Sequence, residues 1–285
     1  MTADYVLGAD PGLGYGGPHA PRPFLRIVGD SATAGEGHLA EEVPVAMVYG
    51  NRPHAVMMCT PLDFEDLAVG FSVSEGIVAT AADVQGVRIS QHSRGVELRI
   101  AVPEAAHARL AARARGLPGR TGCGLCGVEA IDEVVRTIPV VHATLQTDAA
   151  SLQRASEALF DQQTVHQATR AAHAAAWVPG NGGSVVVRED VGRHNAVDKL
   201  LGALWRGGVE PSRGFVVVTS RLSYELVQKV AVAGVPLIAA GSRPTGLAIR
   251  LAERAGITVA VVGRDAVDVY THPERLLADR PPADR

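Results

Sequence analysis

Short apolar runs alternate with longer amphipathic stretches through the second half of the chain. The runs at residues 215–219, 237–240 and 258–262 are almost entirely apolar, and the stretches between them have helical periodicity. Strands that are apolar on both faces are typical of parallel sheets covered by helices. The pattern therefore predicts repeated strand–helix–strand units. It assigns strands also to 184–188, and helices to 128–136, 151–160, 195–204, 223–233 and 245–255.

The first half of the chain differs, because its apolar runs come in pairs. Residues 43–49 and 54–59 flank Gly-Asn-Arg-Pro, and residues 84–90 and 96–101 flank Ser-Arg-Gly. Paired runs joined by such turns predict β-hairpins. A helix is predicted from the N-cap Thr60 to about residue 75, and a second helix over 103–115. This half is therefore predicted to be α+β with antiparallel pairing.

Glycine-rich segments suggest the domain boundaries. Residues 1–23 are rich in glycine and proline and lack the basic and apolar regions of a signal peptide, so we expect a disordered leader. Residues 24–115 then form the N-terminal α+β domain. Residues 116–127 form a flexible loop that contains two cysteines, and residues 128–285 form an α/β domain.

Composition narrows the class of protein. Of 285 residues, 47% are hydrophobic and 20% are charged, which is typical of a globular enzyme. The net charge of −3 argues against nucleic acid or an anionic membrane as a partner. No apolar run approaches the roughly 20 residues that span a bilayer. Three cysteines do not make a disulfide framework, so a cytoplasmic location is expected.

Two of the cysteines lie together in the sequence Thr-Gly-Cys-Gly-Leu-Cys-Gly at 121–127. Cys123 and Cys126 come directly before a predicted helix, and Arg120 adds a nearby cation. The positive end of a helix dipole and a neighbouring cation both favour the thiolate form. We therefore expect a nucleophilic thiolate that accepts or hands on sulfur.

Two other interpretations of the cysteine pair stay open, namely half of a zinc site and a redox-active dithiol. A structural zinc site usually draws on a second closely spaced pair of cysteines or histidines. His142, His166 and His173 each stand alone in the sequence. The third cysteine, Cys59, lies in an apolar strand and is predicted to be a core residue.

Serine and arginine follow the predicted parallel strands. Ser220-Arg221 ends one strand, Ser242-Arg243 ends the next, and Arg264 follows the third. Because the carboxyl ends of parallel strands share one edge, where open α/β folds bind ligands, these side chains should lie together. Arginines beside helix N-termini form sites for phosphate or pyrophosphate.

The sequence Glu-Asp-Val-Gly-Arg-His-Asn-Ala-Val-Asp-Lys at 189–199 is rich in side chains that can carry chemistry. His194 lies near the start of a predicted helix, and Asp198 is four residues further on. That spacing lets the carboxylate orient the imidazole, so His194 joins the candidate ligand-binding residues. Alternatively, these residues form a helix cap with a surface ion pair.

Together these motifs resemble the formate dehydrogenase accessory sulfurtransferase family, FdhD. The resemblance extends in order over about residues 40–277. It includes 122–129, 189–199, 219–229, the early sequences Val-Ala-Met-Val-Tyr-Gly and Asp-Leu-Ala-Val-Gly-Phe-Ser-Val-Ser-Glu-Gly-Ile-Val, and the late sequence Val-Tyr-Thr-His-Pro-Glu-Arg-Leu.

The resemblance implies a sulfur carrier. Sulfur would come from a cysteine desulfurase as a persulfide on Cys123, with Cys126 as the family's second cysteine. It would pass to the molybdenum of a bis(molybdopterin guanine dinucleotide) substrate before that cofactor enters formate dehydrogenase, with no permanent cofactor on the carrier. The family's cofactor-binding stretch falls on Val261, Val262, Gly263, Arg264, Asp265 and Ala266.

The resemblance also implies a three-layer α/β domain similar to cytidine deaminases, a smaller N-terminal domain and a homodimer. The deaminase sequence Pro-Cys-x-x-Cys is missing, because Gly122 and not proline precedes Cys123. A similar fold therefore does not imply deaminase activity in this chain. The alternatives are a zinc-dependent deaminase-like or zinc-binding module, and a non-catalytic cofactor chaperone whose cysteines ligate molybdenum.

Overall fold

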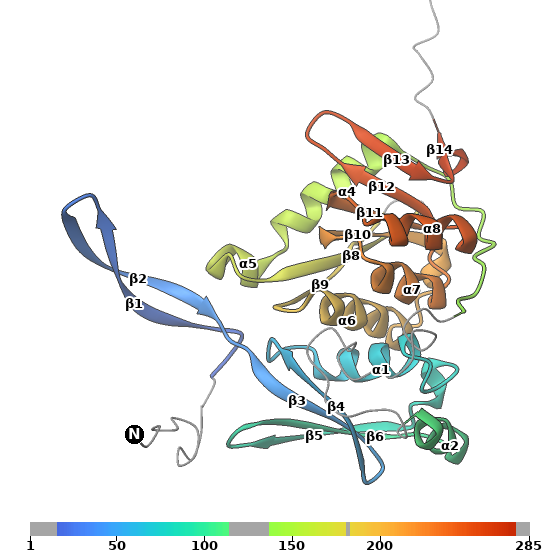
Figure 1. The fold of residues 1–285 in the computed structure, drawn as a ribbon, viewed down its shortest axis with the longest axis horizontal. Helices are drawn as coiled ribbons and strands as arrows, with labels where there is room; N and C mark the ends of the chain where they lie inside the picture. Colours follow the sequence, from blue (N-terminus) through green and yellow to red (C-terminus); the bar gives the residue numbers. More distant parts are fainter. Residues whose placement is uncertain (1–15, 114–136, 181–182, 278–285) are drawn as a thin grey trace, which may run out of the picture.

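A computed structural model describes residues 16–113, 137–180 and 183–277 of the chain (Figure 1). It contains a smaller N-terminal domain, a larger C-terminal domain and a long β-hairpin that projects away from both. Both cysteines of the predicted loop 116–127 and the predicted helix 128–136 lie outside these residues. Within the described ranges, no helix combines the length and apolar character needed to cross a bilayer.

The N-terminal domain is a four-stranded sheet in the order β4-β3-β6-β5. The strands are β3 (Val43–Tyr49), β4 (Arg52–Cys59), β5 (Gly86–His92) and β6 (Gly95–Ala101). Both predicted hairpins are confirmed, because β3 pairs with β4 and β5 with β6 in antiparallel fashion. The two central strands β3 and β6 are parallel, so the prediction of antiparallel pairing throughout is wrong. The helix α1 (Phe64–Ser74) lies between the hairpins in the chain and makes this parallel crossover possible.

Helix α1 begins three residues later than the sequence predicts, with Asp63 and not Thr60 at the N-cap position. Asp63, in the left-handed conformation at φ 54°, precedes Phe64, while Thr60 is buried and bonded to the C-terminal domain. The side chains of Val45, Met47, Leu98 and Ile100 share a core with the apolar face of α1. A second helix, α2 (Glu104–Arg113), follows β6 as predicted.

The C-terminal domain is built on a six-stranded sheet in the order β13-β12-β11-β10-β8-β9. Its strands are β8 (His173–Pro179), β9 (Val186–Asp190), β10 (Gly214–Arg221), β11 (Leu237–Ser242), β12 (Thr258–Val262) and β13 (Val267–Thr271). The predicted parallel set β10, β11 and β12 is confirmed. The sheet as a whole is mixed, because β8 and β13 run in the opposite direction. Neither of these two strands was predicted.

Successive residues of the central strands face opposite sides of this sheet, and helices cover both sides. Val216, Val218, Ile238 and Ala240 pack in one core with α6 (Arg193–Arg206), α7 (Tyr224–Val232) and α8 (Gly246–Ala255). Phe215, Val217, Leu237 and Ala239 pack on the other side with α4 (Ala149–Asp161). The remaining short elements are α5 (Thr164–Thr169), β7 (Thr147–Asp148), β14 (Leu276–Leu277), η1 (Ala81–Asp83), η3 (Pro211–Arg213) and η4 (Pro273–Arg275).

The two domains meet where α1 crosses α6, and glycines permit the close approach. A Cβ on Gly70 would lie 1.8 Å from the carbonyl oxygen of Asp198, and a Cβ on Gly202 would lie 1.9 Å from that of Asp66. Such distances are impossible for any larger residue, so the helices touch backbone to backbone. This contact fixes the N-terminal domain against the helix that follows β9.

The projecting hairpin consists of β1 (His19–Val28) and β2 (Ser31–Ala40). Its two-residue turn, Gly29-Asp30, has Gly29 at φ 57°, as tight hairpin turns require. Strand β1 starts at His19, within the stretch 1–23 that the sequence assigned to a disordered leader. The correction has a physical reason, because each strand of this ribbon is stabilised by its neighbour and not by a buried face of its own.

Candidate functional site

The strands β9, β10, β11 and β12 all run in the same direction and end at one edge of the C-terminal sheet. We call this the carboxyl edge. Arg221 is the last residue of β10 and pairs in register with Ser242, which precedes Arg243. Arg264 lies in the turn between β12 and β13. The structure thus brings the three predicted arginines to one edge.

All three guanidinium groups are exposed at this edge. Within the described ranges, the guanidinium groups of Arg221, Arg243 and Arg264 form no hydrogen bond or ion pair. Of the two predicted serines, Ser220 is buried and Ser242 is half-buried. The three guanidinium groups are therefore open to solvent or to a bound anion.

The predicted cofactor-binding stretch at 261–266 divides into two parts. Val261 and Val262 belong to β12, and the Val261 side chain is buried in the sheet. The side chain of Val261 therefore packs in the core, while the ligand-binding role of the stretch stays a prediction. Gly263, Arg264, Asp265 and Ala266 form an exposed turn, in which the Gly263 N–H donates to the Ala266 carbonyl oxygen at 2.8 Å.

Three helices begin at the carboxyl edge and point their N-termini toward it. Gly192 precedes α6, Ser223 precedes α7, and Thr245 caps α8 by accepting a hydrogen bond from the Ala248 N–H at 3.3 Å. The first N–H groups of a helix carry partial positive charge and bind anions. The helix N-termini add to the field of the arginines, so the edge as a whole favours a polyanionic ligand.

A second group of basic side chains lies at the β8 end of the carboxyl edge. His173 begins β8 and is the cross-strand partner of Asp190. Burial first, and then the charges of Arg193 and nearby His166, lower the pKa of His173. The described residues provide Arg193 with no hydrogen-bond or ion-pair partner. Sequence reasoning missed this cluster, because β8 was not predicted as a strand.

His194 pairs with a residue that sequence spacing did not indicate. Its Nε2 lies 3.5 Å from Oε2 of Glu225, in the first turn of α7. Burial acts to raise the pKa of Glu225, but the His194 ring and the Ser223 hydroxyl outweigh it and lower the pKa to about 2. Glu225 is therefore a carboxylate beside the His194 ring, although the 3.5 Å contact is not a hydrogen bond, since His194 Nε2 has no hydrogen-bond partner among the described residues.

Asp198, which was expected to orient His194, points instead into the domain interface. Its Oδ1 accepts hydrogen bonds from the Ser74 hydroxyl at 2.6 Å and from Lys229 Nζ at 2.9 Å. Lys229 also contacts Glu75 Oε1 at 2.8 Å. Burial alone would lower the pKa of Lys229, but the carboxylates of Asp198 and Glu75 raise it. The expected pairing of His194 with Asp198 is therefore wrong.

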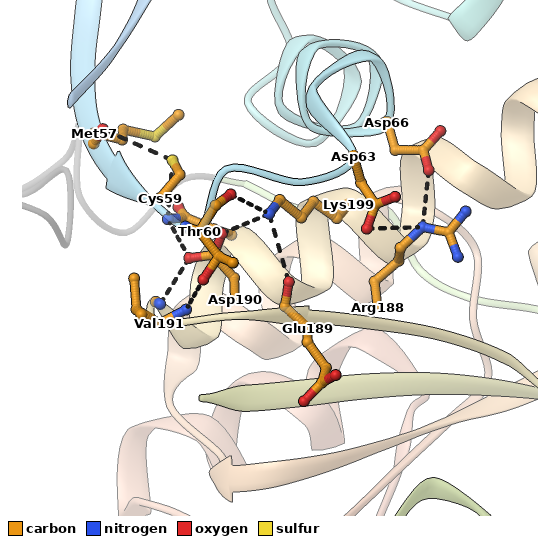
Figure 2. A network of polar contacts seen from close by, with 12 residues as sticks. Met57, Cys59, Thr60, Asp63, Asp66, Arg188, Glu189, Asp190, Val191 and Lys199 are labelled. Atoms are coloured by element: carbon orange, nitrogen blue, oxygen red, sulfur yellow. Dashed lines mark hydrogen bonds and ion pairs between the residues drawn. The ribbon is translucent and has the colours of Figure 1, made fainter. Parts of the chain in front are cut away.

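A second buried ion pair supports the start of α6 (Figure 2). Lys199 Nζ lies 2.7 Å from Asp190 Oδ2, and both side chains are fully buried. Lys199 also donates to the carbonyl oxygen of Thr60 at 3.0 Å. Asp190 in turn accepts from the N–H groups of Thr60 at 3.0 Å and Gly192 at 2.7 Å, and from the Asn195 amide at 2.9 Å. The loop from β9 to α6 is thus fastened to the end of β4.

Cys59 belongs to this buried network, and the prediction that it is a core residue is confirmed. Its Sγ lies 3.3 Å from the Asn195 amide nitrogen. Burial, followed by the negative charge of Asp190, raises the pKa of the Cys59 thiol well above its usual value. A buried, protonated thiol is a poor nucleophile, so Cys59 is a structural residue.

A shallow pocket of about 380 Å³ lies beside β9, away from the arginines. It is lined by Leu62, Asp63, Gln162, Thr164 and residues 185–189 of the chain. Arg188 closes one side through contacts from its Nε to Asp66 at 2.8 Å and to Asp63 at 3.6 Å (Figure 2). Asp66 also pairs with Arg206 of α6. None of the residues predicted to bind a ligand lines this pocket.

The described ranges hold no cluster of three or more histidine, cysteine or acidic side chains arranged for a metal ion. His272-Pro-Glu274 has the His-x-Glu spacing of zinc deaminases, but the His272 ring contacts the carbonyl oxygen of Glu253 at 3.0 Å. That contact lies at the end of α8, on the opposite edge of the sheet. Cys123 and Cys126 fall outside the described residues, so their place relative to the carboxyl edge stays a prediction.

Comparisons with known proteins agree with the resemblance in the sequence. A family model described as FdhD/NarQ family matches residues 40–277. A protein named sulfur carrier protein FdhD from Xanthomonas euvesicatoria is 50% identical over 249 residues, covering 87% of this chain and 88% of the relative. Another of that name, from Bordetella bronchiseptica, is 44% identical over 263 residues, covering 91% and 95%.

Among solved structures, the fold matches that of a protein described as a formate dehydrogenase accessory protein from Desulfotalea psychrophila. The TM-score is 0.71 with 23% sequence identity, and the match covers 91% of this chain and 99% of that one. At this identity the likeness concerns the mixed α/β fold alone.

Proposed function

This chain belongs to the FdhD/NarQ family, and we propose from that premise that it carries sulfur for the maturation of a formate dehydrogenase. Cys123 accepts sulfur from a cysteine desulfurase as a persulfide. It passes the terminal sulfur to the molybdenum of a bis(molybdopterin guanine dinucleotide) substrate held at the carboxyl edge. In that step the S–S bond would break, the reduced metal substrate would supply the two electrons that bring the transferred sulfur to the sulfide level, and Cys123 would leave as a thiolate. The cofactor then enters the dehydrogenase.

The observation that carries the proposal is the set of three arginines at the carboxyl edge whose guanidinium groups are unpaired among the described residues. A guanine dinucleotide contains pyrophosphate, and pyrophosphate is bound by arginines and by helix N-termini. Arg221, Arg243 and Arg264 together with the starts of α6, α7 and α8 supply both kinds of group. We include His194, whose Nε2 lies 3.5 Å from Glu225 Oε2, among the residues proposed to contact the ligand.

Sulfur acceptance is an exchange between sulfur atoms and involves no net oxidation. The Cys123 thiolate attacks the outer sulfur of the desulfurase persulfide, a new S–S bond forms, and the donor cysteine leaves as a thiolate. Cys123 needs only a reactive thiolate and correct positioning for this step. Cys126, three residues away, is proposed to relay or resolve the persulfide.

A persulfide carrier is expected in a reducing compartment, which supports a cytoplasmic location.

Two further expectations from the family belong to the same proposal. The likeness of the C-terminal domain to cytidine deaminases is supported by a mixed sheet with helices on both faces. The homodimer is proposed on the family resemblance alone.

Intact mass measurement tests the proposed function directly. After incubation with a cysteine desulfurase and cysteine, the protein should gain the mass of one sulfur atom, and cyanide should remove it. A chain that stays unmodified, while an established acceptor in the same reaction gains sulfur, would overturn the proposal. Stoichiometric zinc bound by the two cysteines would favour the zinc-binding alternative.

A further inference from the structure

An exposed acidic side chain, Asp265, lies at the β12 end of the carboxyl edge. Arg264 and Asp265 form the tip of the turn between β12 and β13, and both side chains are exposed. The Gly263 N–H closes this turn by donating to the Ala266 carbonyl oxygen at 2.8 Å. The turn therefore presents a cation and a carboxylate next to each other, where a ligand of the carboxyl edge would lie.

Asp265 differs from two other carboxylates near this edge, because those two already have neighbours of opposite charge or polarity. Asp190 lies 2.7 Å from Lys199, and both side chains are fully buried. Glu225 lies 3.5 Å from the His194 ring. Within the described ranges, Asp265 forms no hydrogen bond or ion pair. Its two oxygens are therefore open to donors that a ligand brings.

A carboxylate is an unfavourable neighbour for the phosphates of the proposed ligand. The three arginines of the carboxyl edge attract phosphate, whereas Asp265 repels it. The repulsion is offset where the ligand also brings hydrogen-bond donors to the carboxylate. Because ionised phosphate groups are acceptors, such donors come from another part of the ligand.

The ring systems of the proposed ligand have suitable donors. Guanine carries an N–H at N1 and an amino group at C2 along one edge, and the pterin ring carries the same pair at N3 and C2. An ionised carboxylate has two acceptor oxygens and no donor, so it can accept both bonds at once. Adenine instead places an acceptor nitrogen beside its amino group, and this acceptor repels a carboxylate.

The order of charges along the edge fits an elongated nucleotide. Strands β10, β11 and β12 are neighbours, so Arg221, Arg243 and Asp265 follow one another across the sheet. Neighbouring strands lie about 4.8 Å apart, so this row extends about 10 Å from β10 to β12. A nucleoside diphosphate has its phosphates at one end and its base at the other. With its phosphates at Arg221 and Arg243, its base would lie near Asp265.

We propose that Asp265 recognises the adjoining N–H and amino groups that guanine and pterin rings share. The inference rests on the proposed function, because it takes a guanine dinucleotide as the ligand, and it adds the residue that selects the ring. Asp265 and Arg264 then divide the work between them, since the carboxylate contacts a ring edge and the guanidinium contacts phosphate. Sulfur uptake by Cys123 does not require this contact.

Nucleotides that differ in one group test the proposal. In calorimetry, the wild-type protein should bind guanosine diphosphate about 10-fold or more tightly than inosine diphosphate, which lacks the amino group. Adenosine diphosphate should bind no more tightly than inosine diphosphate. Asp265→Asn should lose the preference for guanine, because an amide pairs with only one of the two donors of the base. Asp268→Asn, at another exposed carboxylate of β13, is the matched control and should keep the preference.

Inorganic pyrophosphate separates recognition of the base from simple charge. Asp265→Asn should bind guanosine diphosphate more weakly but pyrophosphate at least as well as the wild type, since the substitution removes a negative charge beside the phosphates. A variant that binds both ligands more tightly would show that the carboxylate only repels phosphate, which overturns the proposal. Equal dependence of all three nucleotides on Asp265 and on added magnesium would assign the carboxylate to a metal bridge and would also overturn it.

A free pterin distinguishes the two rings. A guanine preference that depends on Asp265 assigns the carboxylate to guanine, whereas a pterin that binds the wild type but not Asp265→Asn assigns it to the pterin, and either result supports the proposal. Binding without either discrimination overturns this inference and leaves the arginine site intact. Absence of all binding overturns the placement of the cofactor at the carboxyl edge as well, while sulfur uptake is judged separately by mass measurement.

Discussion

His194 and Glu225 join the first turns of α6 and α7 through an ion pair of 3.5 Å between Nε2 and Oε2. The pair ties together two of the three helices whose N-termini form the carboxyl edge. It also brings a histidine ring and a carboxylate together where α6 and α7 begin.

This pair predicts a loss of stability in acid. The pKa of Glu225 is about 2 in the folded protein, against 4.5 for the ordinary carboxyl group. A depressed folded pKa contributes stability above the unfolded pKa, and that contribution is lost as pH falls from about 4.5 toward 2. In the wild-type protein, the midpoint of urea unfolding should fall as the pH is lowered from about 4.5 toward 2. In the Glu225→Gln protein, this fall should be smaller. Glu253→Gln, on the surface of α8, should leave it unchanged.

The two cysteines should differ in their effect on sulfur acceptance. Cys123→Ser should abolish the added sulfur mass and formate dehydrogenase maturation, because a hydroxyl cannot form a persulfide. Cys126→Ser should reduce maturation but still allow Cys123 to take up sulfur. An active Cys123→Ala protein beside an inactive Cys126→Ala protein would show that the two roles are reversed.

The carboxyl edge should bind guanosine diphosphate in a salt-dependent way. Replacing Arg221, Arg243 and Arg264 together with alanine should weaken binding at least about 10-fold, because charge-assisted contacts to phosphate are lost. Calorimetry at low and high salt measures the effect. Arg52, Arg88 and Arg94, exposed in the N-terminal sheet, give a control triple substitution with the same change of net charge. Equal binding by both triple variants would show that the nucleotide binds outside the carboxyl edge.

The buried pair of Lys199 and Asp190 should matter far more for folding than a surface pair. Lys199→Ala leaves the Asp190 carboxylate buried without its cation, which costs about 3–5 kcal/mol of unfolding free energy. Arg213→Ala breaks the exposed pair with Glu210 and should cost far less, because solvent screens the two charges. Chemical denaturation of the two variants gives the comparison, and similar costs would contradict the prediction.

The helix crossing should be intolerant of a single methyl group. Gly202→Ala would place a Cβ 1.9 Å from the carbonyl oxygen of Asp66, so α1 and α6 must move apart. We expect a loss of about 2 kcal/mol or more in unfolding free energy. Gly241→Ala is the control, because a Cβ there has nothing within 4 Å. A fully stable Gly202→Ala protein would mean that the crossing is looser than described.

Much of the candidate site could be anticipated from the sequence because its parts lie at the ends of local elements. Arg221, Arg243 and Arg264 each follow a strand with a strong apolar pattern, and parallel strands necessarily align their ends. The partner of His194 could not be found in this way. Spacing along α6 pointed to Asp198, whereas Glu225 reaches His194 from another helix and Asp198 is drawn into the domain interface by Lys229.

By itself, the sequence determined the parallel centre of the C-terminal sheet, since runs such as 215–219 can be buried only with helices on both sides. It also determined both N-terminal hairpins, whose turns are local. Only the tertiary structure decided that β8 is a strand, because His-Ala-Ala-Ala-Trp-Val-Pro has no clear period and takes its conformation from β9 and β10. Thr60 shows the same limit, since the bond from its N–H to Asp190, 130 residues away, keeps it out of the helix it was expected to cap. Local periodicity records which faces of an element are buried, whereas the choice between competing hydrogen bonds depends on distant segments that the fold brings close.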